Sequence, residues 1–181
     1  MRTNHLRKQY ILIIISFYNL IINYSPFFLK KYILKMTGCK IGKKTYLHFN
    51  LKLYTIGRLE IGDNCTINNN CILDNRKKIT LGNNTMLGHN VKIYTLSHDF
   101  NDPLFGDKGG AVKISDNVVI FPNSIIMPNT IISEGVVVLP GCVLSGVTII
   151  DGVYGGVPGK LISKRNPQKK YKLNYGYYFS N

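Results

Sequence analysis

The sequence is poor in charge, and acidic residues are especially scarce. Only 18% of its 181 residues are charged, below the usual quarter, and 23 Lys and Arg outnumber nine Asp and Glu, for a net charge of +14. Between Ile114 and Gly159 there is no Lys or Arg. A nucleic-acid-binding protein would show a basic stripe with interleaved aromatics or a known module, and neither is present. Basic ends on a neutral trunk instead favour CoA phosphates, anionic lipid or an acidic glycan as partner, and no nucleic acid.

Paired cysteines and clustered histidines are also missing. Cys39, Cys65, Cys71 and Cys142 form no CxxC pair, which argues against a zinc finger, and we interpret them as reduced structural thiols of a cytoplasmic protein. His98 has no two further histidines close in sequence, as a three-ligand metal site would need. The sequence therefore predicts no metal.

A hydrophobic run long enough to span a membrane is absent as well. The apolar run Tyr10–Ile22 is shorter than the roughly 20 residues of a spanning helix, and no small-residue cleavage site follows it. We predict two apolar helices, at residues 3–24 and 26–37, that form an N-terminal arm of residues 1–37. This arm could cover the end of the folded core, lie on a membrane surface or act as an anchor, and the sequence leaves the three open.

The strongest positive signal is a six-residue period. Amphipathic helices repeat at 3.6 residues and sandwich strands at 8–12, so this period indicates an all-β solenoid, a three-sided column of short parallel strands. A two-residue slip near Asn75–Lys78 interrupts it once. Each hexad begins with a large aliphatic residue that we expect inside the column: Ile61, Ile67, Leu81, Leu87, Ile93, Ile114, Ile120, Ile126, Ile132, Val138 and Leu144.

Two further columns of the repeat predict its corners. The fifth position is small and includes three of the four cysteines. The fourth position tolerates a positive φ, which a tight corner demands, and a proline before it, as at Pro122, Pro128 and Pro140, is typical of a type II turn. The fourth-position residues are Asn64, Asn70, Asn84, Asn90, Asn117, Asn123, Asn129, Gly135 and Gly141.

Several outward positions between residues 114 and 159 are Ile, Val, Phe or Met rather than polar residues. An exposed apolar strip of this kind indicates an interface, and closed cyclic symmetry would bury it. We therefore predict a homotrimer.

One long insertion interrupts the repeat. The hexad Ile93–His98 is followed by a Gly- and Pro-containing segment of residues 99–113 before Ile114 resumes the period. Repeat proteins place insertions on their working face. His98 is then the last coil residue before a loop, which makes it the candidate catalytic base.

Two segments resemble one family. Ser97–Phe105 is similar to the His-Asp-x-x-Asp-Pro-x-Phe loop of hexapeptide-repeat O-acetyltransferases of polysaccharide biosynthesis, and Tyr154–Ile162 to their Gly-x-Pro-Ala-Lys-Val-Ile ending, with Gly159 in place of Ala. The resemblance implies a left-handed parallel β-helix over residues 38–162, followed by a basic and aromatic tail of residues 163–181.

The resemblance also implies roles for single residues. His98 would be the general base, oriented by Asp99 or Asp102 unless Asp102 only forms a turn. Asn70, Asp102 and Phe105 would contact the acceptor, although Asn70 is also explained as a corner residue of the repeat. Many members carry Thr-Lys where this chain has Ser145 and Gly146, which puts one phosphate contact in doubt. The implied acetyl-CoA contacts are Lys113, Pro122, Pro140, Ser145, Lys160, Lys164 and Arg165.

These observations predict an acetyl-CoA-dependent O-acetyltransferase that modifies a sugar hydroxyl of a cell-surface polysaccharide. Its acceptor could be a lipid-linked glycan at the inner face of the cytoplasmic membrane, where the N-terminal arm would make peripheral contact. N-acetylation of an amino sugar and O-acetylation of an antibiotic remain alternatives on the same fold. A zinc hydrase or a non-catalytic structural solenoid agrees less well with one histidine beside the only long insertion.

Overall fold

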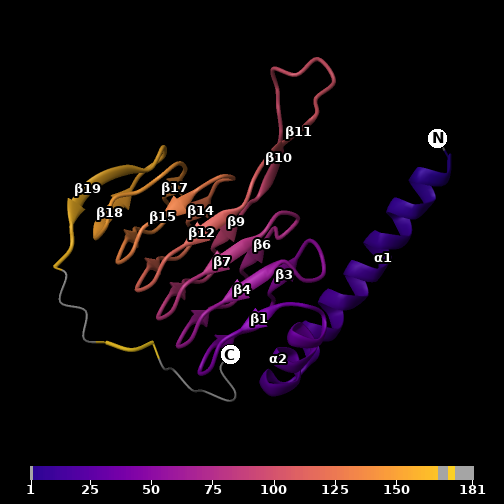
Figure 1. Ribbon diagram of the computed structural model, residues 1–181, viewed down its shortest axis with the longest axis horizontal. Coiled ribbons are helices and arrows are strands. Elements are labelled where there is room, and N and C mark those ends of the chain that lie inside the picture. Colours follow the sequence, from indigo (N-terminus) through magenta and orange to yellow (C-terminus); the bar gives the residue numbers. More distant parts are fainter. Residues whose placement is uncertain (1, 167–170, 174–181) are drawn as a thin grey trace.

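The computed structural model describes residues 2–166 and 171–173 and shows a three-sided parallel β-helix of about six turns behind two N-terminal helices (Figure 1). The predicted solenoid is confirmed. Face A contains β1 (Lys40–Ile41), β4 (Leu59–Ile61), β7 (Ile79–Leu81), β12 (Val112–Ile114) and β15 (Ile131–Ile132). Face B contains β2 (Tyr46–Leu47), β5 (Thr66–Ile67), β8 (Met86–Leu87), β13 (Val119–Ile120), β16 (Val137–Val138), β18 (Gly152–Gly155) and β19 (Lys160–Lys164). Face C contains β3 (Lys52–Leu53), β6 (Ile72–Leu73), β9 (Lys92–Ile93), β14 (Ile125–Ile126) and β17 (Val143–Leu144).

The interior of the column is built from the first position of each hexad. All eleven predicted aliphatic residues are buried, and they stack directly on one another, as Ile61 on Leu81 and Leu81 on Ile114. Each such side chain contributes about 1.5–3 kcal/mol through its removal from water. The core is therefore a continuous rod of aliphatic side chains.

The corners follow the fourth position, as predicted. All nine predicted residues have positive φ, between 53° and 73°. Asparagines in successive turns also bond to one another: Asn84 Nδ2 donates to Asn117 Oδ1 at 2.9 Å, and Asn90 Nδ2 donates to Asn123 Oδ1 at 3.1 Å. The corner asparagines therefore supply both the backbone conformation and a polar ladder along the edges of the column.

The hexad Ile93–His98 was predicted wrongly. Thr95, rather than Ser97, takes the buried small position, and the chain then leaves the column. Leu96–His98 forms β10, which pairs antiparallel with β11 (Asp107–Gly109) in a projecting hairpin. The insertion thus starts before residue 99 and ends before residue 113, because Val112–Ile114 is already the coil strand β12.

The C-terminal boundary also differs from the expected one at residue 162. The strand β19 turns back antiparallel on β18, with Gly152 opposite Lys164, so the column ends in a hairpin that continues past this point. Arg165 N then donates to Asp151 O at 2.8 Å. Of the predicted tail, residues 167–170 and 174–181 lie outside the described part of the chain.

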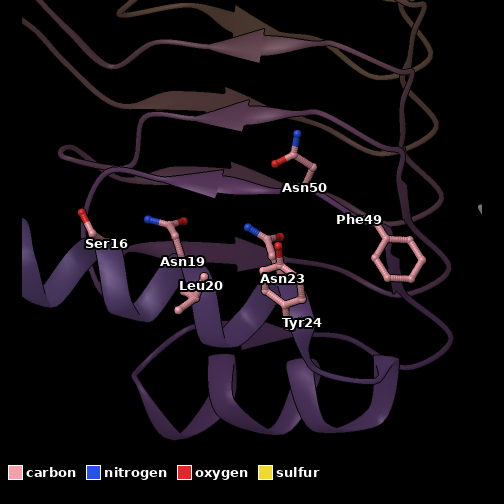
Figure 2. A pocket seen from close by; sticks show the side chains of 7 residues that line it. All are labelled: Ser16, Asn19, Leu20, Asn23, Tyr24, Phe49 and Asn50. Carbon is pink, nitrogen blue, oxygen red and sulfur yellow. The ribbon is translucent and has the colours of Figure 1, made fainter.

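The long helix α1 (Arg2–Tyr24) closes the open edge of face C. Asn19 Nδ2 donates to Leu53 O at 2.8 Å and Asn19 Oδ1 accepts from Leu53 N at 2.8 Å; Asn23 makes the same pair of bonds with Leu51, at 3.0 and 2.9 Å. Figure 2 shows both amides pointing from α1 toward the first turn of the column. Because an open strand edge invites pairing with another chain, two helix asparagines here replace a missing strand.

The short helix α2 (Phe27–Met36) closes the edges of the other two faces with lysines. Lys30 Nζ donates to His48 O at 2.8 Å, and Lys31 Nζ donates to Gly42 O. Burial lowers the pKa of Lys30 to about 8. The expected helices thus cover the end of the column, and no helix among the described residues is long and apolar enough to cross a membrane.

The apolar strip predicted on the later turns is exposed in the single chain. Its exposed members include Phe121, Ile131, Val147, Ile150 and Val157. The homotrimer that this strip suggests remains a prediction.

We expect Asn23→Leu to lower the free energy of unfolding by about 1–3 kcal/mol, because it leaves the N–H and C=O of Leu51 without their partner. Urea denaturation would measure this loss. Ser16→Leu is the matched control, since the Ser16 hydroxyl bonds only to Leu12 O of its own helix. Equal stability of Asn23→Leu and the unsubstituted chain would contradict the capping role.

The stability of the column should fall at alkaline pH. Burial raises the pKa of Cys71 to about 12 from a usual value of 9.0, so above about pH 9 the unfolded chain loses this proton first. The contribution is complete below pH 9 and is lost as pH rises toward 12, by about 1.4 kcal/mol per unit. Cys71→Ala should flatten the decline in unfolding free energy between pH 9 and 10.5. Val91→Ala, a buried neighbour without a titratable group, should lower stability and keep the slope.

Candidate active site

The hairpin that carries His98 leaves the column at the corner between faces C and A. It follows β9, projects well beyond the column in Figure 1 and returns at Gly109. A Cβ atom at Gly109 would meet Thr95 O, so the returning strand can pass this close only as glycine. The hairpin therefore has a fixed base on the column and an exposed tip.

The ring of His98 is held by its own hairpin. Its Nδ1 lies 3.0 Å from Phe105 O, and its ring stacks on the Phe105 ring with centroids 4.7 Å apart. Because a carbonyl oxygen only accepts, Nδ1 carries the hydrogen and donates it. The neutral ring then presents an unprotonated Nε2, and the side chain is half exposed. This is the arrangement of a proton acceptor.

Neither aspartate suggested by the sequence orients His98. Asp99 is bonded to Lys108 Nζ at 2.9 Å, and this ion pair lowers the pKa of Asp99. Asp102 accepts from the backbone N–H groups of Leu104 and Gly106, so it shapes the loop turn. The carboxylate near the ring is Asp107, whose Oδ1 lies 3.5 Å from His98 Nδ1. Since that nitrogen already donates to a carbonyl, Asp107 acts through its charge when the ring is protonated.

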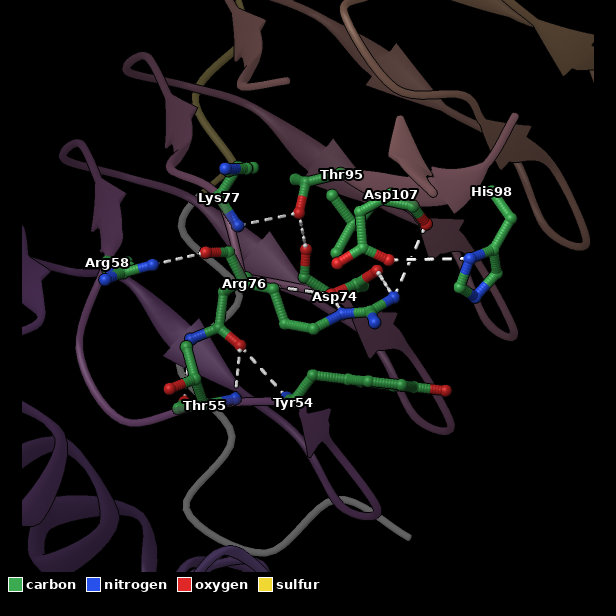
Figure 3. Close-up of polar contacts among 11 residues, drawn as sticks. Tyr54, Thr55, Arg58, Asp74, Arg76, Lys77, Thr95, His98 and Asp107 are labelled. Atoms are coloured by element: carbon green, nitrogen blue, oxygen red, sulfur yellow. Dashed lines mark hydrogen bonds and ion pairs between the residues drawn. The ribbon is translucent and has the colours of Figure 1, made fainter. Parts of the chain in front are cut away.

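An ion pair with one buried partner supports the base of the hairpin (Figure 3). The carboxylate of Asp74, fully buried, accepts from Arg76 Nε and Nη2, both at 2.8 Å. Arg76 Nη2 also reaches Leu96 O at 3.4 Å, where β10 begins, and its guanidinium lies over the Tyr54 ring at 5.4 Å. Arg76 thus links the second turn of the column to the first strand of the hairpin.

Thr95 completes this support. Its hydroxyl donates to Asp74 O at 2.6 Å and accepts from Lys77 N at 2.9 Å. Lys77 belongs to the two-residue slip in the repeat, and Asp74 directly precedes it, so the slip packs against the base of the hairpin. Sequence reasoning found the slip and missed its role, although its position one turn before the insertion was an available signal.

Asn70, the predicted acceptor residue, lies away from His98 within one chain. It sits at the corner before β6, whereas the hairpin comes after the neighbouring parallel strand β9. The two therefore lie at opposite corners of face C, one before and one after its strands. Its Oδ1 accepts from Asn50 Nδ2 at 2.8 Å. Pro122 and Pro140 occupy the same corner in later turns, where Gly141 N donates to Pro122 O.

The other predicted CoA residues are dispersed. Lys113 projects from face A and lines an open pocket of about 450 Å³ with Ser115 and Glu134. Ser145 follows β17 and shares the hairpin corner. Lys160 and Lys164 are exposed on β19.

Arg165 is occupied by structural contacts. Its Nη1 donates to Gly135 O at 3.2 Å, and its Nη2 donates to Tyr171 Oη at 3.0 Å. Its guanidinium also lies over the Tyr171 ring, with Cζ 5.7 Å from the centroid. Arg165 therefore ties the chain after β19 to the column.

A second pocket, of about 540 Å³, lies between α1 and the corner at Phe49 and Asn50 (Figure 2). Two of the amides that line it, Asn19 and Asn23, are already bonded to the strand edge. Tyr24 and Phe49 contribute apolar surface to the pocket. Across the described residues, no group of three His, Cys, Asp or Glu side chains is placed to hold a metal ion.

Comparison with known proteins connects this geometry to a family. Residues 111–146 match the family model described as bacterial transferase hexapeptide (six repeats). A maltose O-acetyltransferase from Clostridium difficile 630 is 28% identical, with 84% of each chain covered and a TM-score of 0.76. The chain is thus similar to hexapeptide-repeat acetyltransferases in sequence and in fold. The resemblance noted in the sequence is thereby confirmed, together with the left-handed β-helix.

Two further structures show the range of this fold. A hexapeptide-repeat acetyltransferase from Vibrio cholerae O1 biovar eltor, complexed with acetyl coenzyme A, is 22% identical over 83% of this chain and 84% of its own, with a TM-score of 0.77. An N-acyltransferase mutant from Bacillus cereus, complexed with dTDP and coenzyme A, is 24% identical over 78% and 92%, with a TM-score of 0.60. No curated protein sequence gives a significant match.

We expect Arg76→Gln to loosen the hairpin, because it leaves the buried Asp74 carboxylate without its ion pair. Stability should fall by about 1–3 kcal/mol, less than for a fully buried pair because Arg76 is partly exposed. Hydrogen exchange should accelerate in β10 and β11. Lys40→Gln, which removes an exposed ion pair with Glu60, is the control and should leave the hairpin protected. Unchanged exchange in Arg76→Gln would contradict the supporting role.

Proposed function

We propose that this chain transfers an acetyl group from acetyl-CoA to a hydroxyl group of a sugar. The observation that carries the proposal is the His98 ring, whose Nδ1 is held by Phe105 O and whose Nε2 is thereby left as a base on a projecting hairpin. Similarity to hexapeptide-repeat acetyltransferases supports acetyl-CoA as the donor, since acetyl-CoA is bound in one of the similar structures.

The proton transfer follows from this tautomer. A sugar hydroxyl is a weak nucleophile until its proton is removed, and a neutral imidazole accepts a proton efficiently near neutral pH. His98 Nε2 takes the hydroxyl proton while Nδ1 stays bonded to Phe105 O. The resulting imidazolium is stabilised by the nearby Asp107 carboxylate, modestly because both side chains are exposed.

The acyl transfer then needs no covalent enzyme intermediate. The sugar oxygen attacks the thioester carbon, the carbon–sulfur bond breaks, and the CoA sulfur takes up a proton from the imidazolium. No cysteine serves as nucleophile, because all four are buried and burial raises the pKa of each thiol, to about 11 at Cys65 and about 12 at Cys71.

Binding of CoA is proposed for the exposed lysines. Lys113, Lys160 and Lys164 can meet the phosphates as point charges, with Ser145 beside the hairpin corner. Arg165 has a structural role in the tether after β19 and is the weakest candidate. Pro122 and Pro140 would contribute corner surface to the CoA groove.

A homotrimer would unite the dispersed residues. His98 and Asn70 lie at opposite ends of face C within one chain, so one cleft can contain both only if a neighbouring copy supplies the second. The exposed apolar strip on the later turns supplies surface for such packing. In this arrangement Asn70, Phe105 and the turn formed by Asp102 would border the acceptor.

The acceptor class is supported by comparison. The similar Clostridium protein is a maltose O-acetyltransferase, which supports a sugar hydroxyl, and the apolar N-terminal helices agree with a lipid-linked glycan of a cell-surface polysaccharide. An amino-sugar acceptor is the second candidate, favoured by the similarity to the Bacillus N-acyltransferase. The same His98 would serve either reaction.

We expect His98→Ala to lower kcat by about 10²–10⁴ while the fold is retained, because the half-exposed ring is not part of the core. Release of free CoA thiol from acetyl-CoA, with a panel of sugars and amino sugars, measures this. Lys43→Ala, at an exposed corner of the first turn between faces A and B, is the control and should keep full activity. Near-normal turnover by His98→Ala would refute the assignment.

A further inference from the structure

The outward face of α1 is an unpartnered apolar stripe. Tyr18, Ile22 and the two capping asparagines face the column, which leaves the opposite side of the helix exposed. Only toward its C-terminal end do Leu20 and Tyr24 also line the pocket that includes Phe49. The outward side chains recur at spacings of four and three residues, as on one face of a helix. Each is more than half exposed: Leu6, Tyr10, Ile13, Phe17, Leu20 and Tyr24.

The middle of α1, from Tyr10 to Ile14, is apolar on every side. Tyr10, Ile11, Leu12, Ile13 and Ile14 are consecutive and all exposed, and at 100° per residue they cover the full circumference of the helix. A single partner helix would cover one stripe and leave the others in water. Lipid acyl chains surround a helix from several sides, so a bilayer matches this segment better than one protein partner.

The positive charge of the same region favours lipids with anionic headgroups. Residues 1–59 contain eleven Lys and Arg and no Asp or Glu. Pairing this surface with a second copy would bring like charges together, whereas anionic headgroups complement them. Arg7 is exposed at the flank of the stripe and can extend toward phosphates, and Lys8 is exposed on the other side of the helix, where it adds positive charge. The tyrosines Tyr10 and Tyr24 suit the interface between water and acyl chains.

We propose that α1 lies flat in the headgroup region of an anionic phospholipid bilayer, with the stripe from Leu6 to Tyr24 turned into the acyl chains. The asparagines on its other face stay bonded to the first turn of the column. The β-helix would then stand on the membrane by its N-terminal end, with α1 as an interfacial helix rather than a spanning one. The inference rests on the helix and not on the acetyl-transfer reaction.

A single introduced tryptophan tests the depth of the stripe, because the chain contains none. With phosphatidylglycerol-containing vesicles, the emission of Phe17→Trp should move to shorter wavelength and be quenched by brominated acyl chains. Phe121→Trp, on a corner of the column, is the matched control and should show neither effect. An unchanged Phe17→Trp spectrum with these vesicles would overturn the proposal.

Sedimentation with the same vesicles separates insertion from adsorption by charge. Ile13→Glu with Phe17→Glu should weaken binding at least about tenfold and leave the thermal melt unchanged, since both side chains are exposed. Arg7→Gln and Lys8→Gln should each weaken it about fivefold, and phosphatidylcholine vesicles should bind poorly. Equal binding of the double glutamate variant would show adsorption by charge alone. Dissociation of an oligomer by that variant, without vesicle binding of the unsubstituted chain, would show that a second copy covers the stripe. Either result would refute the insertion.

Discussion

The parallel hydrogen bonds between successive turns constrain everything else in this structure. Each turn must present its N–H and C=O groups in register with the next, so the strands tolerate no extra residues. Stacked residues on faces A and C show where extra length is allowed. From face C to face A the chain takes eight residues in the first two turns, 21 in the third and six in the fourth. All additional length is placed at one corner, and the hairpin is its largest instance.

That constraint explains which parts of the fold could be predicted. The inward aliphatic residues and the corner asparagines are fixed by local rules, burial and positive φ, and every one of them lies where the period indicates. The start of the hairpin is different. Thr95 and Ser97 are both small, and the choice between them depends on pairing of β10 with residues that come nine or more positions later. A local period carries no information about such pairing.

In the candidate site, too, some features could be predicted from the sequence and others could not. The position of His98 beside the insertion is visible in the sequence, because one histidine at the only long break stands out. Its partner is a backbone carbonyl, that of Phe105, which any residue type could provide. The support from Asp74 and Arg76 arises from stacking of one turn on another and has no counterpart in sequence proximity to His98. Asp99 was the natural candidate by sequence, yet Lys108 across the hairpin binds it.

The N-terminal end shows how closing the column creates a second surface. A stack of parallel strands has an open edge at its first turn, and the asparagines and lysines of the two helices satisfy it. For its amides to reach Leu51 and Leu53, which flank Lys52, α1 must lie across the end of the column with one fixed face inward. Its opposite face is then turned away from the protein by the same geometry. The cap therefore fixes the orientation of the apolar stripe, and the scarcity of acidic residues in this part of the chain determines which surface the stripe can meet.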